Sequence, residues 1–159
     1  MKILVVSDTH GRDDGLERAV ERERPFDMLV HCGDVEGREI FIEALAECPC
    51  CIVAGNNDFF SDLPKEEEIT VAGHRVLVTH GHVYGVSMDY TRLVEEAKAR
   101  GCDGAFFGHI HKPVLEEKDG FVLLNPGSLS FPRQIGRKQS YAVVKVDDEG
   151  NVTAAIRYL

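Results

Sequence analysis

The chain has 159 residues, close to one domain at roughly 100–200 residues per domain, so we predict a single domain over residues 1–159. Apolar residues make up 43% of the chain and aromatic residues 8%, which suffices for an ordinary hydrophobic core. The formal net charge of −9 repels polyanions and argues against long nucleic acid as the main partner.

The sequence shows no targeting or membrane segment. The apolar stretch at residues 3–6 is too short for a secretory signal, and no run approaches the ~18 apolar residues that cross a bilayer. We therefore expect a cytoplasmic protein without a membrane partner. The cysteines are odd in number and include only one C-x2-C spacing, which favours reduced structural thiols over a zinc or redox site: Cys32, Cys48, Cys50, Cys51 and Cys102.

Strand-like and helix-like patterns alternate through residue 111. Apolar, β-branched runs that end abruptly in Asp, Asn or His occur at residues 2–10, 27–34, 50–58, 75–82 and 103–111. Helical spacing of apolar residues occurs at 15–24, 38–47 and 88–101, the last with Gly101 as its C-cap. This alternation predicts a largely parallel sheet.

The pattern changes after Pro113. Residues 114–125 and 140–159 each suggest two strands around a turn, at Asp119-Gly120 and at Glu149-Gly150-Asn151. We therefore predict antiparallel pairing in the second half of the chain.

The polar ends of the five predicted strands indicate a shared site. Ligands of open α/β sheets bind beyond the carboxyl ends of parallel strands, where these ends would converge if the strands are neighbours. Residues i and i+2 of an extended segment point the same way, so Asp8 and His10 can share a target, as can His109 and His111. Taken singly, each such residue would be explained by solvation or turn formation. Together with Asp34, Asn56, Asp58, His80 and His82, they indicate a metal site.

Taken together, the residues at these strand ends resemble the sequence signature of the calcineurin-like metallophosphoesterases. That signature consists of D-x-H, G-D, G-N-x-D, H and G-H-x-H, in this order. The corresponding residues occur in that order, at 8–10, 33–34, 55–58, 80 and 108–111. The short chain and the NPGS at 125–128 are similar to the small YfcE-type phosphodiesterase branch. The resemblance implies an α/β fold, a four-layer αββα sandwich of two mixed sheets flanked by helices.

The resemblance also implies two divalent metal ions. It assigns one ion to Asp8, His10, Asp34 and His111, and the second to Asp34, Asn56, His80 and His109. Asp34 would bridge the ions, and a carboxylate suits this role because two cations about 3.5–4 Å apart need an anionic bridge. Nitrogen and oxygen ligands without thiolate fit Mn²⁺, Fe²⁺, Zn²⁺ or Ni²⁺, and the resemblance favours Mn²⁺.

The implied reaction is hydrolysis of a small phosphodiester by in-line attack of a hydroxide held between the metals. Asn57 stands where larger relatives with G-N-H-D have a histidine. Its amide would donate to phosphoryl oxygens, but it cannot act as a general acid. We predict either that His82, on the same side of an extended chain as His80, protonates the leaving group, or that leaving groups are intrinsically good. Asp58 would orient a neighbouring side chain or cap a turn.

Two other segments have both a functional and a structural interpretation. Arg133, Arg137 and Lys138 would bind a substrate phosphate if their segment folds over the site, and otherwise form a solvated loop. Asn125 and Ser128 would shape the pocket floor or simply form a turn.

Alternatives remain within and beyond enzymes. The P-loop, dinucleotide-binding, H-E-x-x-H and G-x-S-x-G motifs are absent, which argues against nucleotide-driven motors and serine hydrolases. A retromer subunit of the same resembled family is a non-enzymatic scaffold with an impaired metal site. In this sequence, by contrast, every ligand position of the signature has a residue that can bind a metal. A phosphomonoesterase or nucleotide phosphatase would use the same centre. Turnover discriminates these functions, and the sequence leaves open the natural substrate and a homo-oligomeric state.

Overall fold

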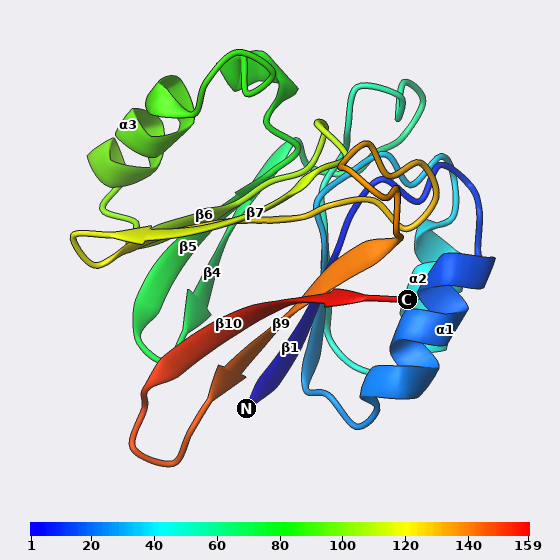
Figure 1. Ribbon diagram of the computed structural model, residues 1–159, viewed down its shortest axis with the longest axis horizontal. Helices are drawn as coiled ribbons and strands as arrows, with labels where there is room; N and C mark the ends of the chain where they lie inside the picture. Colours follow the sequence, from blue (N-terminus) through cyan, green and yellow to red (C-terminus); the bar gives the residue numbers. More distant parts are fainter.

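The computed structural model describes residues 1–159, which form two five-stranded sheets packed face to face (Figure 1). The first sheet has the order β10-β9-β1-β2-β3, with β1 (Lys2–Val6), β2 (Met28–His31), β3 (Cys50–Ile52), β9 (Ser140–Val146) and β10 (Val152–Tyr158). The second has the order β4-β5-β6-β8-β7, with β4 (Glu66–Val71), β5 (His74–Thr79), β6 (Gly104–Phe106), β7 (Pro113–Lys118) and β8 (Phe121–Pro126).

Helices cover the outer face of each sheet. Helices α1 (Asp14–Glu23) and α2 (Glu39–Ala46) pack on the first sheet, and α3 (Thr91–Ala99) packs on the second (Figure 1). A short 3-10 helix, η1 (His82–Tyr84), follows β5. None of these helices combines the length and apolar character that a bilayer crossing requires.

The hydrophobic core has three parts, one for each contact between layers. In β1, Leu4 and Val6 pack in the cluster with α1 and α2, whereas Ile3 and Val5 pack in the cluster between the sheets. Successive strand residues face opposite ways, and both faces of this strand are covered, so all four side chains are buried. A third cluster joins α3 to the second sheet through Leu93, among others. The predicted four-layer αββα sandwich is confirmed.

Two predictions of topology need correction. The five predicted strands do not belong to one sheet, because β1, β2 and β3 are parallel in the first and β5 and β6 are parallel in the second. The second half is not wholly antiparallel, because β8 pairs in parallel with β6. Periodicity indicates that a segment is a strand but does not select its partner.

Strand β4 was not predicted. It begins with three consecutive glutamates and lies at the edge of its sheet, where side chains are half exposed and the apolar signal is weak. The turn to β5 has positive φ at Ala72 (50°) and Gly73 (85°), as two-residue hairpin turns require. The three predicted helices are confirmed, with ends shifted by up to three residues.

All five cysteines are free, and Cys32, Cys51 and Cys102 are buried. Burial raises the pKa of Cys50 and of Cys51 to about 12, so these thiols stay protonated at neutral pH. This state accords with the predicted structural role and gives no sign of a reactive thiolate.

His31, the last residue of β2, is fully buried and makes stability depend on pH. Its Nε2 lies 3.0 Å from Thr9 Oγ1, and its Nδ1 accepts a hydrogen bond from the Gly33 amide at 3.2 Å. Burial lowers the pKa of His31 from 6.5 to about 4, although Asp8 and Asp58 oppose the shift. The folded state therefore disfavours the proton that the unfolded chain binds below about pH 6.5.

We expect His31 to make the metal-free protein less stable as pH falls. Its contribution is complete above pH 6.5 and is lost as pH falls towards 4, so the free energy of unfolding should drop by about 2 kcal/mol from this group between pH 7 and pH 5. Urea unfolding in chelator at both pH values measures the drop. In His31→Asn, which retains an acceptor for the Gly33 amide, the drop should be smaller by that amount. An equal drop in both proteins would contradict the assignment.

Candidate metal centre

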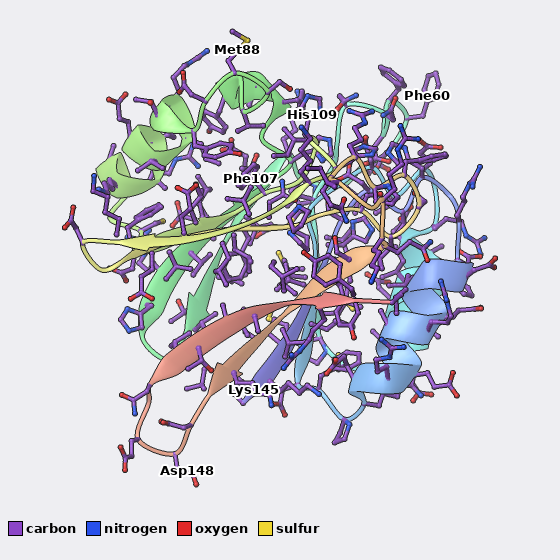
Figure 2. All side chains as sticks on the ribbon, in the orientation of Figure 1. Phe60, Met88, Phe107, His109, Lys145 and Asp148 are labelled. Atoms are coloured by element: carbon purple, nitrogen blue, oxygen red, sulfur yellow. The ribbon has the colours of Figure 1, made fainter.

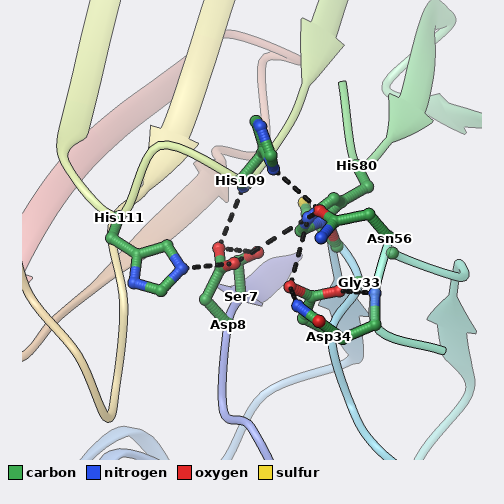
Figure 3. Close-up of polar contacts among 12 residues, drawn as sticks. Ser7, Asp8, Gly33, Asp34, Asn56, His80, His109 and His111 are labelled. Carbon is green, nitrogen blue, oxygen red and sulfur yellow. Dashed lines mark hydrogen bonds and ion pairs between the residues drawn. The ribbon is translucent and has the colours of Figure 1, made fainter. Parts of the chain in front are cut away.

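The loops that follow β1, β2, β3, β5 and β6 bring polar side chains together (Figure 3). The residues on these loops are Asp8, His10, Asp34, Asn56, His80, His109 and His111. The carboxyl ends of both sets of parallel strands lie at the same edge of the sandwich. The predicted convergence therefore occurs across two sheets, not along one.

These loops turn sharply with left-handed backbone. The φ angle is 53° at Asp8, 49° at His10, 58° at Asp34, 70° at His109 and 56° at His111. Such angles cost about 1–3 kcal/mol for a residue with a side chain and are concentrated at functional sites. The extended-chain argument for the i and i+2 pairs was therefore wrong in its geometry, since tight turns bring these side chains together.

Two glycines allow the backbone to pass directly against the carboxylates. A Cβ at Gly108 would lie 2.1 Å from Ser7 Oγ and 2.9 Å from Asp8 Oδ2. A Cβ at Gly55 would lie 2.1 Å from Asp34 Oδ1. Both positions exclude any other residue because of this close approach.

Four side chains form a first group that can hold a metal ion. One ligand atom from each of Asp8, His10, Asp34 and His111 lies within 4.8 Å of the others. His111 Nε2 is 3.1 Å from Asp8 Oδ1 (Figure 3). His10 Nε2 is 3.7 Å from Asp34 Oδ2. Nitrogen and carboxylate oxygen are ligands that first-row divalent metals accept.

The hydrogen bonds of the two imidazoles leave both inner nitrogens as acceptors. His10 Nδ1 donates to Glu36 Oε1 and His111 Nδ1 donates to the Phe131 carbonyl, each at 2.8 Å, since neither oxygen can donate. In the neutral rings the two Nε2 lone pairs then face each other at 3.2 Å. Asp8 Oδ1 beside them is buried without a hydrogen-bond partner. Three acceptor atoms within 3.8 Å of one another fit a cation.

Asn56, His80 and His109 form a second group on the other side of Asp34. Asn56 Oδ1 lies 3.0 Å from His80 Nε2 and 2.8 Å from His109 Nδ1, and His80 Nε2 lies 3.5 Å from Asp34 Oδ2. His80 Nδ1 donates to the Cys32 carbonyl at 2.7 Å, which directs Nε2 towards Asn56 and Asp34. Asp34 thus lies between the two groups, as a bridging ligand would.

Two carboxylates of the centre are held in the ionised form. Burial would raise the pKa of Asp34, but His80 and the hydrogen bonds from Asn57 hold that pKa well below its usual range. Burial would also raise the pKa of Asp8, yet His111 and His80 keep it below its ordinary value. In the reverse direction, Asp34 and Asp8 raise the pKa of His80 despite its burial. Two buried, ionised carboxylates create a site that attracts positive charge.

The two residues after Asn56 contact the Asp34 loop. The Asn57 amide Nδ2 donates to Asp34 Oδ2 at 2.7 Å, and its backbone N–H donates to Asp34 Oδ1 at 2.9 Å. The Asp58 carboxylate accepts backbone hydrogen bonds from Gly55, Asp34, Val35 and Glu36. Both side chains therefore hold Asp34 in place, and Asp58 does far more than cap its own turn.

His82 lies beside the second group, but not for the reason expected. Gly81 turns the chain with φ 93°, so residues 80–82 are not extended. The His82 ring is still 5.5 Å from the His80 ring and 6.1 Å from the His109 ring, centroid to centroid. Its Nδ1 is buried without a partner, and burial together with His80 lowers the pKa of His82.

The segment after β8 folds against the first group. Ser128 Oγ donates to the Asp8 carbonyl at 2.8 Å, and Asn125 Nδ2 donates to the Gly108 carbonyl at 2.7 Å. Arg133 and Arg137 line a cleft with His10 and His111, whereas Lys138 does not border this cleft. Asn125 and Ser128 thus support the loops of the centre, and two of the three predicted basic residues reach its edge.

Sequence reasoning missed Glu36 and Ser130. Glu36 fixes the tautomer of His10, and Ser130 Oγ donates to the Asp8 carbonyl at 2.8 Å. Glu36 follows the G-D block by two residues, and only this proximity would have suggested it. Ser130 lies 122 residues from Asp8 in the chain, and no local pattern links them.

Comparison with known proteins agrees with this geometry. A profile of the calcineurin-like phosphoesterase superfamily domain matches residues 1–149. The probable metallophosphoesterase YsnB of Bacillus subtilis is 34% identical over 161 residues, with 99% of this chain and 90% of that protein covered. The phosphodiesterase YfcE of Escherichia coli is 28% identical over 171 residues, with 92% and 89% covered.

Solved structures show the same fold. A predicted phosphoesterase from Streptococcus pneumoniae superposes with a TM-score of 0.80 at 27% sequence identity. The superposition covers 99% of this chain and 97% of that protein's chain. Vps29 from Entamoeba histolytica, solved in complex with Zn²⁺, has a TM-score of 0.76 at 20% identity, with 99% of each chain covered. The fold thus occurs in proteins described both as phosphoesterases and as Vps29.

Proposed function

The chain belongs to the calcineurin-like phosphoesterase superfamily, and we therefore propose that it is a phosphodiesterase that hydrolyses a small diester at a centre of two divalent metal ions. The observation that carries the proposal is a set of three acceptor atoms within 3.8 Å of one another, the Nε2 atoms of His10 and His111 and the unpartnered Asp8 Oδ1. Mn²⁺ is the metal we propose, with Fe²⁺, Zn²⁺ and Ni²⁺ as alternatives that the same ligands accept.

The residues of the centre would have distinct roles. Asp8, His10 and His111 would hold one ion, Asn56, His80 and His109 the other, and Asp34 both. When bound, the ions supply a nucleophile from water at neutral pH and neutralise charge on the phosphoryl group. Glu36 and the Phe131 carbonyl keep the imidazoles in the ligating tautomer, and Asn57 fixes the orientation of Asp34 by two hydrogen bonds.

A scaffold is the main alternative outside enzymes, because Vps29 shares the fold. Since that protein was solved with Zn²⁺, metal binding alone would not separate the two functions. A complete ligand set, in which His10, His80 and His111 are each oriented by a hydrogen bond at Nδ1, supports the enzyme. Phosphomonoesterase activity would use the same centre, and the surrounding loops would set the choice of substrate. The five free cysteines accord with the cytoplasmic location that we propose.

Turnover tests the proposal directly. Chelated protein should not hydrolyse bis(p-nitrophenyl) phosphate, and Mn²⁺ should restore release of p-nitrophenolate. The monoester p-nitrophenyl phosphate should be a poorer substrate under the same conditions. Absence of turnover with Mn²⁺, Ni²⁺, Zn²⁺ and Fe²⁺, in protein that binds them, would favour the scaffold. Faster monoester hydrolysis would instead identify a phosphomonoesterase.

The His82 ring provides a further prediction about the leaving group. If His82 supplies a proton or a hydrogen bond to the departing oxygen, His82→Ala should slow a methyl-leaving diester more than a p-nitrophenyl-leaving diester, because only the alkoxide needs protonation. We expect the difference to reach about 10²-fold in kcat. His74→Ala, at the exposed start of β5, provides the matched control. Equal slowing of both diesters would exclude this role.

A further inference from the structure

The proposed metal centre assigns no role to a cleft that lies beside the first group of ligands. It measures about 710 Å³ and is lined by His10, His111, Ser130, Phe131, Pro132, Arg133 and Arg137. We call it the arginine cleft. Two proposed metal ligands and two guanidinium-bearing residues therefore border the same space.

The backbone of residues 128–133, which includes Arg133, is fixed to the metal ligands by hydrogen bonds. Ser128 Oγ and Ser130 Oγ both donate to the Asp8 carbonyl at 2.8 Å. The Arg133 backbone N–H donates to the His111 carbonyl at 2.9 Å. The carbonyl of Phe131 accepts from His111 Nδ1 at 2.8 Å. The position of this backbone relative to the centre is thus set by the fold, unlike that of a solvated loop.

The charges of the cleft lack partners within the protein. Neither Arg133 nor Arg137 forms an ion pair, although the chain is acidic and pairs Arg38, Arg75 and Arg100 with carboxylates. The guanidinium of Arg12 lies 4.4 Å from the centre of the Phe131 ring and adds a third cation beside the cleft. Guanidinium groups bind phosphate through forked, charge-assisted hydrogen bonds. Two guanidinium groups without ion-pair partners beside the proposed phosphodiesterase centre indicate a site for an anion.

The position of the cleft indicates which anion it binds. Asp34, Asn56, His80 and His109 do not line it, so the cleft opens on the outer side of the first group rather than over Asp34. A phosphoryl group held between the two groups would lie over Asp34. Arg133 and Arg137 therefore border the space beyond the position of that phosphoryl group. The backbone hydrogen bond from Arg133 to His111 keeps this space next to the centre.

We propose that the arginine cleft binds a second phosphate of the substrate, so that the preferred substrate is a small diester whose retained alcohol carries a terminal phosphate group. This inference rests on the proposed phosphodiesterase function and specifies its substrate class. Arg133 and Arg137 are the residues that determine this specificity.

Two diesters with the same leaving group test the proposal. Both release p-nitrophenolate when water displaces it from phosphorus, and they differ only in the other alcohol, which is methanol in one and 2-phosphoethanol in the other. The Mn²⁺-loaded protein should have a higher kcat/KM for the phosphate-bearing diester. In the double variant Arg133→Gln/Arg137→Gln, the ratio of the two kcat/KM values should fall about tenfold, as expected for lost charge-assisted hydrogen bonds.

The matched control is Arg92→Gln/Arg18→Gln, because Arg92 on α3 and Arg18 on α1 are exposed and the two substitutions remove the same two charges. The ratio should stay unchanged in this variant. It should also decrease with added salt in the wild-type protein, since exposed charges are screened. A ratio that Arg133→Gln/Arg137→Gln leaves unchanged, or that Arg92→Gln/Arg18→Gln lowers equally, would overturn the proposal.

A binding measurement separates failure of the cleft from failure of the proposed function. Titration calorimetry on the Mn²⁺-loaded protein compares methylphosphonate with propane-1,3-bisphosphonate, neither of which is hydrolysed. We expect the bisphosphonate to bind more tightly in the wild type and to lose about tenfold of that preference in Arg133→Gln/Arg137→Gln. Absence of turnover with this preference intact would refute the phosphodiesterase and retain the anion site. Turnover of the methyl diester without any preference for the bisphosphonate would refute the anion site alone.

Discussion

Asp34→Asn is expected to lower Mn²⁺-dependent hydrolysis of bis(p-nitrophenyl) phosphate by at least about 10³-fold. Asp34 lies between the two groups of ligands, with Oδ2 3.7 Å from His10 Nε2 and 3.5 Å from His80 Nε2, and it approaches both more closely than Asp8 does, at 3.8 and 3.9 Å. An amide keeps the shape of the side chain but removes the charge that would offset repulsion between two cations. Metal ions contribute several kcal/mol to charge stabilisation, and each 1.36 kcal/mol corresponds to about tenfold in rate.

The measurement combines kinetics with metal content. Purified variant and wild type are loaded with Mn²⁺, desalted and assayed for bound metal, and the variant should retain less than the wild type. Asp148→Asn is the matched control, because Asp148 lies in the β9–β10 turn, at the other end of the molecule from His109 (Figure 2). Near-wild-type turnover by Asp34→Asn with full metal content would contradict a bridging role for this carboxylate.

The sequence predicted the components of the centre better than their geometry. The resemblance of the ordered short blocks to the family signature assigned Asp8, His10, Asp34 and His111 to one metal, and these four side chains do lie together. The residues alone indicated a shared site because each block follows an apolar strand. The left-handed turns at Asp8 and Asp34 were not predictable, since only tertiary contacts make such angles acceptable for residues with side chains.

Contacts between residues far apart in the chain explain the other features that the sequence did not predict. Strand β4 carries no clear apolar pattern, and the pairing of β8 with β6 depends on how two sheets stack. The hydrogen bonds of Ser130 to Asp8 and of His111 to Phe131 join segments that share no motif. Residue types thus indicated the chemistry, while the supporting hydrogen bonds required the fold.

Asp58 illustrates how one buried carboxylate can hold two loops of the centre together. Its oxygens accept backbone N–H groups of Asp34 at 2.8 Å, Glu36 at 2.7 Å and Gly55 at 2.7 Å, and that of Val35 at 3.3 Å. Asp34 and Glu36 both have positive φ, so these bonds stabilise the turn that presents Asp34. Without the carboxylate, four donors in a largely buried loop would lose their partner.

We therefore expect Asp58→Ala to destabilise the chelated protein by about 3 kcal/mol, or roughly 6–12 °C in Tm for a chain of this size. Because the Asp34 loop would lose its support, the affinity for Mn²⁺ should also fall about 10–100-fold. Asp58→Asn keeps one oxygen acceptor and should show a smaller loss of both. Thermal unfolding in chelator gives the first quantity, and calorimetric titration with Mn²⁺ gives the second.

Asp147→Ala distinguishes support of the centre from general loss of a turn. Asp147 also accepts backbone hydrogen bonds, from Glu149 at 2.9 Å and Asn151 at 2.8 Å, but in the exposed β9–β10 turn. Water can replace its oxygens there, so this variant should lose less stability and keep its affinity for Mn²⁺. If Asp58→Ala lost no more stability than Asp147→Ala and bound Mn²⁺ normally, the Asp34 loop would hold its shape without Asp58. The positive φ at Asp34 and Glu36 would then have to be stabilised by the surrounding strands alone.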